Sequence, residues 1–370
     1  MIYLDHAATS FPKPAPVLAA VRHWFEELGV SPQRGNSQIC ARVGARVQDV
    51  RHRIATMCGV STHRVAFTSG ATESLNLFLD GFLRPGDAVL TTAMEHSSVV
   101  RPLVHLAEAR DLHIEVLPPD REGGIHPDQF TTALSKREFR LVAFSHGSNV
   151  LGSVLDAATI CDTARNQGCT TLVDASQTAG LLDLDVGADA IVASAHKSLL
   201  APPGLGFLAV REGIPVRMTR FGGTGSAVAL DRQPEEWPTA MESGTPNTPA
   251  ILALGAALDY IEERGRDSIL AWELSLVDAL RRELNSRAQV YGPANGPRIP
   301  VLSFTLSDLD PAEAGVILDS AGIHVRTGFH CAPWLHDLLG TSAAGTVRVS
   351  PGPFNSLADT LEVPRVLPGG

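Results

Sequence analysis

The chain has 370 residues, of which 44% are hydrophobic and 19% charged, so it can bury a sizeable core and lacks the composition of a disordered protein. A formal net charge of -10 argues against a nucleic-acid partner, because phosphate binding needs a basic face. No window approaches the ~18 consecutive apolar residues of a membrane span, and the first residues lack a basic and apolar leader pattern, so we expect a cytoplasmic protein.

Short apolar runs rich in β-branched residues predict strands at 65–68, 88–92, 114–117, 141–145, 170–174, 190–194 and 206–210. Between them the pattern predicts helices at 71–83, 97–110, 127–136 and 156–167, with Pro127 in the first turn of its helix. Strands that alternate with helices imply right-handed crossovers and a mainly parallel sheet covered on both faces. The sequence therefore predicts an α/β fold.

The pattern changes in the last third of the chain. Residues 211–248, rich in Gly and Pro, predict a long connection, and connections of that length are usually functional. Beyond them we expect helices at 249–263, 268–286 and 311–321 and strands at 301–306, 323–327 and 346–350, which form a smaller α+β unit. This predicts a large domain of 14–248 and a small domain of 1–13 with 249–370. We expect Pro364 and Pro368 to cut the last helix short and the tail to be frayed.

Polar residues follow the predicted strands at the edge where an open parallel sheet binds its ligands. Strand 65–68 runs into the small-residue turn 69–73, which opens a helix and has free N–H groups and hydroxyls that suit a phosphate. An ordinary helix cap is the alternative explanation for this turn.

The other strand ends carry groups that each have an ordinary structural explanation when taken alone. They are His96, then His146 with Asn149, then Asp174 with Gln177, and finally Ser194, His196 and Lys197. A carboxylate that closes an apolar strand is costly unless it is paired, and a lysine against a core has the lowered pKa that a Schiff base needs. Together the groups supply a phosphate cradle, a stackable ring, an acid for a ring nitrogen and an amine for an aldehyde. Pyridoxal phosphate is a cofactor whose binding requires this set of groups.

Five cysteines without a C-x-x-C pair fit neither a disulfide framework nor a zinc ribbon. We expect Cys161 and Cys169 to be structural, as most free cysteines are. Cys331 lies in "VRTGFHCAP", and three interpretations are open for it: a reactive nucleophile, part of a metal site with His330 and His336, or a buried thiol. The spacing of the three matches no standard zinc ligand set.

Ten motifs follow one another along nearly the whole chain: "YLDHAATS", "SGATESLN", "EHSSV", "SNVLG", "VDASQTAG", "SAHKSLLAPPGLGFL", "GGTGS", "ESGTPNTPAI", "RTGFHCAP" and "VRVSPGPFN". In these motifs the chain resembles the class V aminotransferase-fold enzymes that use pyridoxal phosphate, and within them the cysteine desulfurases. The resemblance implies the transferase fold type I, with a mainly parallel seven-stranded sheet in the large domain and a smaller α+β C-terminal domain.

The resemblance also implies a role for each matching residue. Lys197 would bind the cofactor covalently, His96 would stack on its ring and act in acid–base steps, and Asp174 would keep the ring nitrogen protonated. Gln177 and Asn149 would lie at the phenolic oxygen, and the phosphate ligands would be Ala71, Thr72, Ser194 and His196, with Thr245 from the second subunit of a dimer. Arg348 would clamp the substrate carboxylate, in a site shared with Asn149, Arg326 and His330.

In this family Cys331 would attack the sulfur of L-cysteine and hold it as a persulfide while alanine leaves. We expect His330, Arg326 and Arg348 to favour the thiolate form. A short "RxGxHCA" cysteine loop usually goes with a sulfur-accepting partner protein. The chain departs from the common pattern at Phe329, where a second histidine often stands, and at 33–38, where we expect Arg34 and Asn36 to line the site.

Other functions remain open on the same scaffold. A selenocysteine lyase, a cysteine-derivative C–S lyase or a class V aminotransferase would not require Cys331. A non-catalytic metal-binding scaffold, by contrast, explains none of the polar groups at the strand ends.

Overall fold

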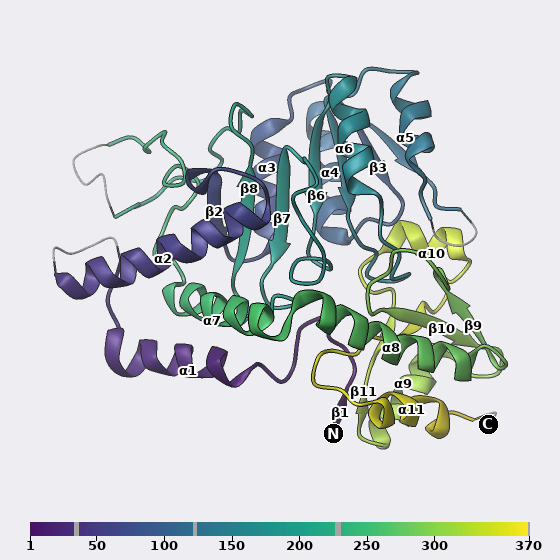
Figure 1. Ribbon diagram of the computed structural model, residues 1–370. Helices are drawn as coiled ribbons and strands as arrows, with labels where there is room; N and C mark the ends of the chain where they lie inside the picture. Colours follow the sequence, from purple (N-terminus) through teal and green to yellow (C-terminus); the bar gives the residue numbers. More distant parts are fainter. Residues whose placement is uncertain (33–36, 121–123, 226–230, 369–370) are drawn as a thin grey trace.

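The computed structural model describes residues 1–32, 37–120, 124–225 and 231–368 (Figure 1). At its centre lies a seven-stranded sheet in the order β2-β8-β7-β6-β5-β3-β4. Neighbouring strands run parallel except for β8, which is antiparallel to both β2 and β7. The strands are β2 (Val65–Thr68), β3 (Ala88–Thr92), β4 (His113–Leu117), β5 (Leu141–Ser145), β6 (Thr170–Asp174), β7 (Ala190–Ser194) and β8 (Gly206–Val210).

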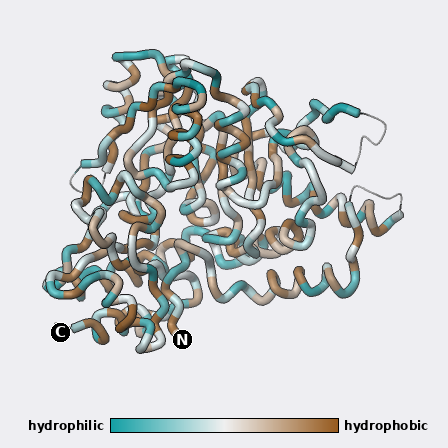
Figure 2. The backbone as a smooth tube through the Cα atoms, turned by 180° about the vertical axis from the view of Figure 1, so that it is seen from behind, coloured by the Kyte–Doolittle hydropathy of each residue, from teal (hydrophilic) through white to brown (hydrophobic). Residues whose placement is uncertain are grey.

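Side chains of the sheet alternate between two apolar layers, as the two-residue period of a strand requires. In β5, Leu141 and Ala143 pack with the helices of one face, whereas Val142 and Phe144 belong to the cluster of the other face. Because both faces are covered, the sheet strands are mainly apolar, and brown segments are frequent in the interior of the tube in Figure 2. The covering helices are α3 (Ala71–Phe82) and α4 (Ser97–Arg110) on one face, and α5 (Pro127–Leu134), α6 (Ala157–Asn166) and α7 (Thr248–Arg264) on the other.

The N-terminal helices extend the second layer. Helix α1 (Ala15–His23), which continues as a π-helical turn (Trp24–Leu28), packs along α7, and α2 (Gln38–Met57) packs on α7 as well. A short 3-10 turn (Thr62–Arg64) then leads into β2.

A second, antiparallel sheet has the order β12-β13-β10-β9. Its own apolar cluster includes Phe304, Val347 and Leu318, and beside it the N-terminal strand β1 pairs with β11 in a separate two-stranded parallel sheet. The elements of this smaller unit are β9 (Ala288–Tyr291), β10 (Leu302–Leu306), β12 (Arg326–Gly328), β13 (Thr346–Val349), β1 (Ile2–Tyr3), β11 (Ile323–His324) and the helices α9 (Pro311–Ser320), α10 (Pro333–Leu339) and α11 (Leu357–Val366).

Helix α8 (Arg266–Leu284) links the two cores. Ile269 packs in the cluster of the large sheet, whereas Val277 and Leu280 pack in the cluster of the small one. Leu4, near the N-terminus, also lies in the apolar cluster of the small sheet. The predicted domain limits of 14–248 against 1–13 with 249–370 stay a prediction.

The predicted fold is confirmed: a mainly parallel seven-stranded sheet with a smaller α+β unit. Six of the seven predicted strands have the predicted limits, and the described part of 211–247 contains neither helix nor strand, with α7 beginning at Thr248. The expectation that Pro364 ends the last helix is wrong, although the helix does end before Pro368. Helix α11 continues through Pro364 to Val366, and Val363 and Leu367 are buried in the small core, so packing holds the last turn in place.

Candidate active site

One cavity of about 200 Å³ lies beyond the carboxyl ends of β3, β5, β6 and β7, where a parallel sheet binds its ligands. The structure brings nearly all the predicted site residues together around it. These lining residues are Ala71, Thr72, His96, Asn149, Asp174, Gln177, Ser194, His196, Lys197, Arg326, His330, Cys331 and Arg348.

Lys197 lies three residues after the end of β7 and is partly buried where it lines the cavity. Burial lowers the pKa of its amine from 10.5 to about 8, and the nearby Asp174 carboxylate acts in the opposite direction. The amine is therefore far closer to its neutral, nucleophilic form at physiological pH than an exposed lysine is. This confirms the lowered pKa that the sequence predicted.

His96 is the N-cap of α4, and its Nδ1 accepts the backbone N–H of Ser98 at 3.0 Å. Burial lowers the pKa of His96 to about 4, so the ring is neutral and carries its proton on Nε2. The Ser98 hydroxyl lies 2.9 Å from the same Nδ1 and 2.7 Å from the Thr72 hydroxyl, both within hydrogen-bond distance. Sequence reasoning missed Ser98, which ties the imidazole to the start of α3.

The start of α3 forms an anion cradle against β8. A Cβ on Gly206 would lie 2.6 Å from the Gly70 Cα, so only glycine lets the strand approach the helix end this closely. The Ala71 N–H donates to the Ser194 hydroxyl at 3.0 Å, and His196 Nδ1 is buried with no hydrogen-bond partner among the described residues. A phosphate here would meet helix N–H groups, hydroxyls and an unpaired imidazole nitrogen.

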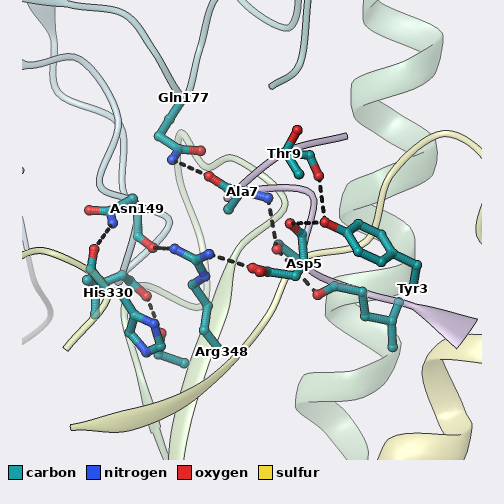
Figure 3. Close-up of polar contacts among 12 residues, drawn as sticks. Tyr3, Asp5, Ala7, Thr9, Asn149, Gln177, His330 and Arg348 are labelled. Carbon is teal, nitrogen blue, oxygen red and sulfur yellow. Dashed lines mark hydrogen bonds and ion pairs between the residues drawn. The ribbon is translucent and has the colours of Figure 1, made fainter. Parts of the chain in front are cut away.

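Two further predicted residues close the cavity. Asp174 ends β6 and accepts the Ser176 N–H with one of its oxygens at 2.9 Å. Gln177 donates to the carbonyl of Ala7 at 2.9 Å, so part of its amide is already engaged by the protein (Figure 3).

Glu95 lies under the cavity, where β3 and β5 separate. The paired part of β3 and β5 includes Leu90 and Val142 but does not reach the ends of the strands. Beyond it, the Glu95 carboxylate accepts the Ser145 N–H at 3.1 Å and the Ser145 hydroxyl at 2.8 Å. Burial raises the pKa of Glu95 to about 7 against the effect of its hydrogen bonds. The carboxyl therefore titrates near neutral pH.

Arg348 lies buried on β13 in a hydrogen-bonded chain that crosses the cavity (Figure 3). Its Nη2 donates to Asp5 Oδ1 at 2.6 Å and its Nη1 to the Asn149 carbonyl at 3.1 Å, while Nε has no partner among the described residues. The Asn149 amide in turn donates to the His330 carbonyl at 2.6 Å. The guanidinium is thus fixed at its end and retains unpaired N–H groups for a carboxylate.

An N-terminal strap, defined as residues 4–10, holds this side of the site, and sequence reasoning assigned it no role. Its backbone pairs with Ser350 of the small unit, and Ser10 donates both its N–H and its hydroxyl to the His196 carbonyl, at 2.9 and 3.0 Å. Lys13 donates to the same carbonyl at 3.0 Å. The peptide before Lys197 is therefore clamped from the far end of the chain. The only sequence signal for this was the "YLDHAATS" motif.

Cys331 is exposed at the cavity, in a tight turn after β12. His330 and Cys331 both have positive φ, 47° and 60°, and the Ala332 N–H closes the turn on the Phe329 carbonyl at 2.9 Å. Ser97 donates its N–H and its hydroxyl to the Cys331 carbonyl, at 2.7 and 3.1 Å. Contacts to Asn149 and Ser97 thus hold in place a backbone conformation that non-glycine residues rarely adopt.

The expectation that the His330 ring supplies positive charge to the thiol is wrong. The ring is buried and its Nε2 lies 2.9 Å from the Thr346 hydroxyl. Burial, helped by the neighbouring Arg348, lowers the pKa of His330 to about 2, so the imidazole is neutral. Positive charge near Cys331 comes from Arg326, Arg348 and Lys197 instead.

Thr245 does not line this cavity. It lines a second one of about 170 Å³ with Ser69, Glu73 and Arg220, so its predicted role requires that it come from another chain. Arg34 and Asn36, expected to line the site, lie outside the described residues. The roles predicted for the site residues in binding cofactor and substrate stay predictions.

The other cysteines, Cys40, Cys58, Cys161 and Cys169, are buried free thiols. His330 and His336 turn toward Thr346 and Thr341, and within the described part of the chain no group of three or more His, Cys, Asp or Glu residues could hold a metal ion. No described helix is both long and apolar enough to cross a bilayer.

The cavity fits pyridoxal phosphate. It has a cradle with an unpaired imidazole nitrogen for the phosphate, a buried carboxylate for a ring nitrogen and a lysine of lowered pKa for the aldehyde. These are the donors that the strand ends predicted.

Comparisons with known proteins agree with this geometry. Residues 2–363 match the model of the family described as aminotransferase class-V. The chain is 34% identical over 366 residues to a protein named probable cysteine desulfurase from Synechocystis sp., covering 95% of this chain and 86% of that protein. It is 34% identical over 358 residues to a cysteine desulfurase from Cronobacter sakazakii, covering 93% and 87%. The apo structure of a cysteine desulfurase from Thermococcus onnurineus superposes with a TM-score of 0.91 at 30% identity, covering 99% of this chain and 93% of that one.

Proposed function

The chain belongs to the class-V aminotransferase family, and from its relatives and its cavity we propose that it is a pyridoxal-phosphate-dependent cysteine desulfurase. It converts L-cysteine to L-alanine and keeps the sulfur as a persulfide on Cys331. The observation that carries this proposal is an exposed cysteine, held on a fixed turn, that lines the same cavity as a partly buried lysine of lowered pKa.

The cofactor supplies an electron sink when it is bound. Lys197 would hold it through the amine, and His196, Thr72 and Ser194 would bind its phosphate. Asp174 would pair with the ring nitrogen, and Gln177 and Asn149 would bind near the phenolic oxygen. The neutral His96 ring would pack against the cofactor, and its Nε2–H would serve acid–base steps.

Arg348 orients the substrate. Because Asp5 and the Asn149 carbonyl fix the end of the guanidinium, the substrate carboxylate binds the N–H groups that remain, including Nε–H. Lys197 would take up the α-proton of the substrate, because a pKa lowered to about 8 leaves a substantial fraction of the amine neutral near that pH.

Cys331 performs the step that distinguishes a desulfurase. Its thiolate attacks the sulfur of the substrate, a new S–S bond forms, and the Cβ–Sγ bond breaks with its electron pair left on the carbon side. Protonation of that carbon yields alanine. The outer sulfur then passes to an acceptor, for which we propose a partner protein because the cysteine loop is short.

A homodimer completes the site with Thr245 from the second subunit. Support comes from the position of Thr245 in a cavity separate from that of its own chain's lysine. A reducing compartment such as the cytoplasm suits a chain whose cysteines are all free.

The test is an assay of L-cysteine and L-selenocysteine in which alanine and pyruvate are both quantified. We expect alanine from L-cysteine in wild type and its loss in Cys331→Ala. Pyruvate without alanine would indicate a C–S lyase, and alanine from L-selenocysteine alone would indicate a selenocysteine lyase.

A further inference from the structure

Two arginines face each other across neighbouring strands at the mouth of the cavity. Arg326 of β12 pairs directly with Arg348 of β13, so both side chains lie on the same face of the small sheet. Like charges placed directly opposite each other destabilise a sheet unless something offsets them. Both residues line the cavity together with Cys331.

Only one of the two arginines has its charge matched within the protein. Arg348 is buried and forms an ion pair with Asp5. Arg326 is exposed and has no hydrogen-bond or ion-pair partner within the ranges that the structure describes. Arg326 is therefore an unmatched charge that is open to solvent and lines the same cavity as the thiol.

The neighbouring groups do not cancel this charge. His330 and His96 are neutral rings, and Asp5 is engaged by Arg348. Asp174 lies at the end of β6 inside the large sheet and is the carboxylate proposed for the cofactor. An anion at the mouth would therefore offset both the unpaired charge and the repulsion between the two arginines.

Resting on the proposed desulfurase function, we propose that Arg326 forms an anion subsite for the sulfur acceptor, which selects acceptor thiols that carry a carboxylate close to the sulfur. The substrate carboxylate binds Arg348, and the acceptor carboxylate binds Arg326 at the mouth. Arg326 thus acts in the second half of the reaction, whereas the sequence predicted a role for it in substrate binding.

The transfer is balanced without any further reactant. The acceptor thiolate attacks the outer sulfur of the Cys331 persulfide, a new S–S bond forms on the acceptor, and the bond to Cys331 breaks. The electron pair of that bond returns to Cys331 as its thiolate. No net oxidation occurs, so the acceptor needs only a thiolate and a charge in the right place.

The experiment loads the holoenzyme with radiolabelled sulfur from L-cysteine and follows its discharge by 3-mercaptopropionate, 2-mercaptoethanol and cysteamine. Rates are expressed per thiolate, because the three thiols differ in their ionisation. Wild type should favour the anionic thiol over the neutral one by about fivefold, the effect of one ion pair in a solvated site, with the cationic thiol slowest. Arg326→Gln should remove this order, and Arg326→Lys, which keeps the charge, should retain most of it.

Three results would overturn the inference. Wild type could show no charge preference, Arg326→Gln could keep the preference, or Arg326→Gln could raise the KM for L-cysteine while the acceptor order stays intact. The last result would mean that Arg326 binds the substrate L-cysteine. These outcomes are separate from a failure of the proposed function, in which no label would load onto Cys331 and both proposals would fall. Arg326 is exposed, so loss of folding is not expected to obscure the comparison.

Discussion

Lys197 owes its proposed chemistry to burial rather than to a neighbouring cation. Burial is the largest influence on its amine, and Asp174 opposes it. Such a residue is recognisable in the sequence only because it follows an apolar strand. The consequence is a nucleophile that is available near neutral pH.

We predict that cofactor-free protein captures pyridoxal phosphate covalently at a rate that rises with pH, with a midpoint near pH 8 and a plateau above it, since only the neutral amine attacks an aldehyde. Stopped-flow absorbance measures this rate. Asp174→Asn serves as the comparison and should shift the midpoint to lower pH, because it removes a charge that raises the pKa of Lys197. A rate in wild type that keeps rising toward pH 10 would show an exposed amine.

Glu95 makes a separate prediction about stability. Its pKa in the folded protein is raised from 4.5 to about 7, so its stabilising contribution is complete below about pH 4.5 and is lost as pH rises through 7. Glu95→Gln preserves the hydrogen bonds of the protonated form without titrating. The free energy of unfolding of wild type relative to this variant should fall by about 3 kcal/mol between acid and alkaline pH.

Melting curves of both proteins across this pH range provide the measurement. Glu273, whose pKa burial also raises, is present in both proteins, so its effect cancels. A difference in stability that does not change with pH would mean that Glu95 does not titrate there.

At the scale of the element, the turn that carries Cys331 is the least ordinary piece of backbone in the site. Two successive non-glycine residues have positive φ there, although their side chains differ in exposure: His330 is buried and Cys331 is exposed. The contacts from Ser97 and Asn149 hold this conformation. Tertiary contacts therefore override local preference in this turn.

We predict that Cys331→Gly is more stable than Cys331→Ala by about 0.5–1 kcal/mol, because both lack the thiol but only glycine adopts this φ without strain. Urea unfolding measures the difference. At exposed Leu338 in α10 the order should reverse, with Leu338→Ala more stable than Leu338→Gly. Equal stability of the two Cys331 variants would argue against strain in the turn.

The sequence could predict those parts of the site that depend on local patterns within one element. Strand ends such as Asp174 and Ser194 were predictable because apolar runs mark strands and parallel strands end at one edge. Asp5 and Ser10 were not, because they act on Arg348 and His196 across more than a hundred residues of sequence. Helix α11 also escaped prediction, because packing of Val363 and Leu367 outweighs the local effect of Pro364.

At the scale of the whole molecule, the site depends on parts that lie far apart in the chain. The N-terminal strap, the large sheet and the small sheet meet at the Asp5–Arg348 pair (Figure 3). A second subunit would add Thr245. The proposal therefore makes cofactor binding a property of the dimer.

Mixed dimers test this dependence. Thr245→Val should weaken cofactor binding about tenfold through loss of one hydrogen bond to a charged group, and Lys197→Ala should abolish covalent capture. If Thr245 acts across the interface, a hybrid of the two variants contains one fully native site and binds cofactor there with wild-type affinity. If Thr245 acts in its own chain, every lysine-containing site in the hybrid keeps the weakened affinity.

The central claim is that Cys331 takes the sulfur of L-cysteine. The most direct measurement is a single turnover with L-cysteine, followed by intact-mass analysis of the protein and quantification of alanine. We predict one sulfur added at Cys331 for each alanine released in wild type, and neither product in Cys331→Ala. Alanine formed by that variant at the wild-type rate, or wild type that forms alanine without gaining sulfur at Cys331, would contradict it.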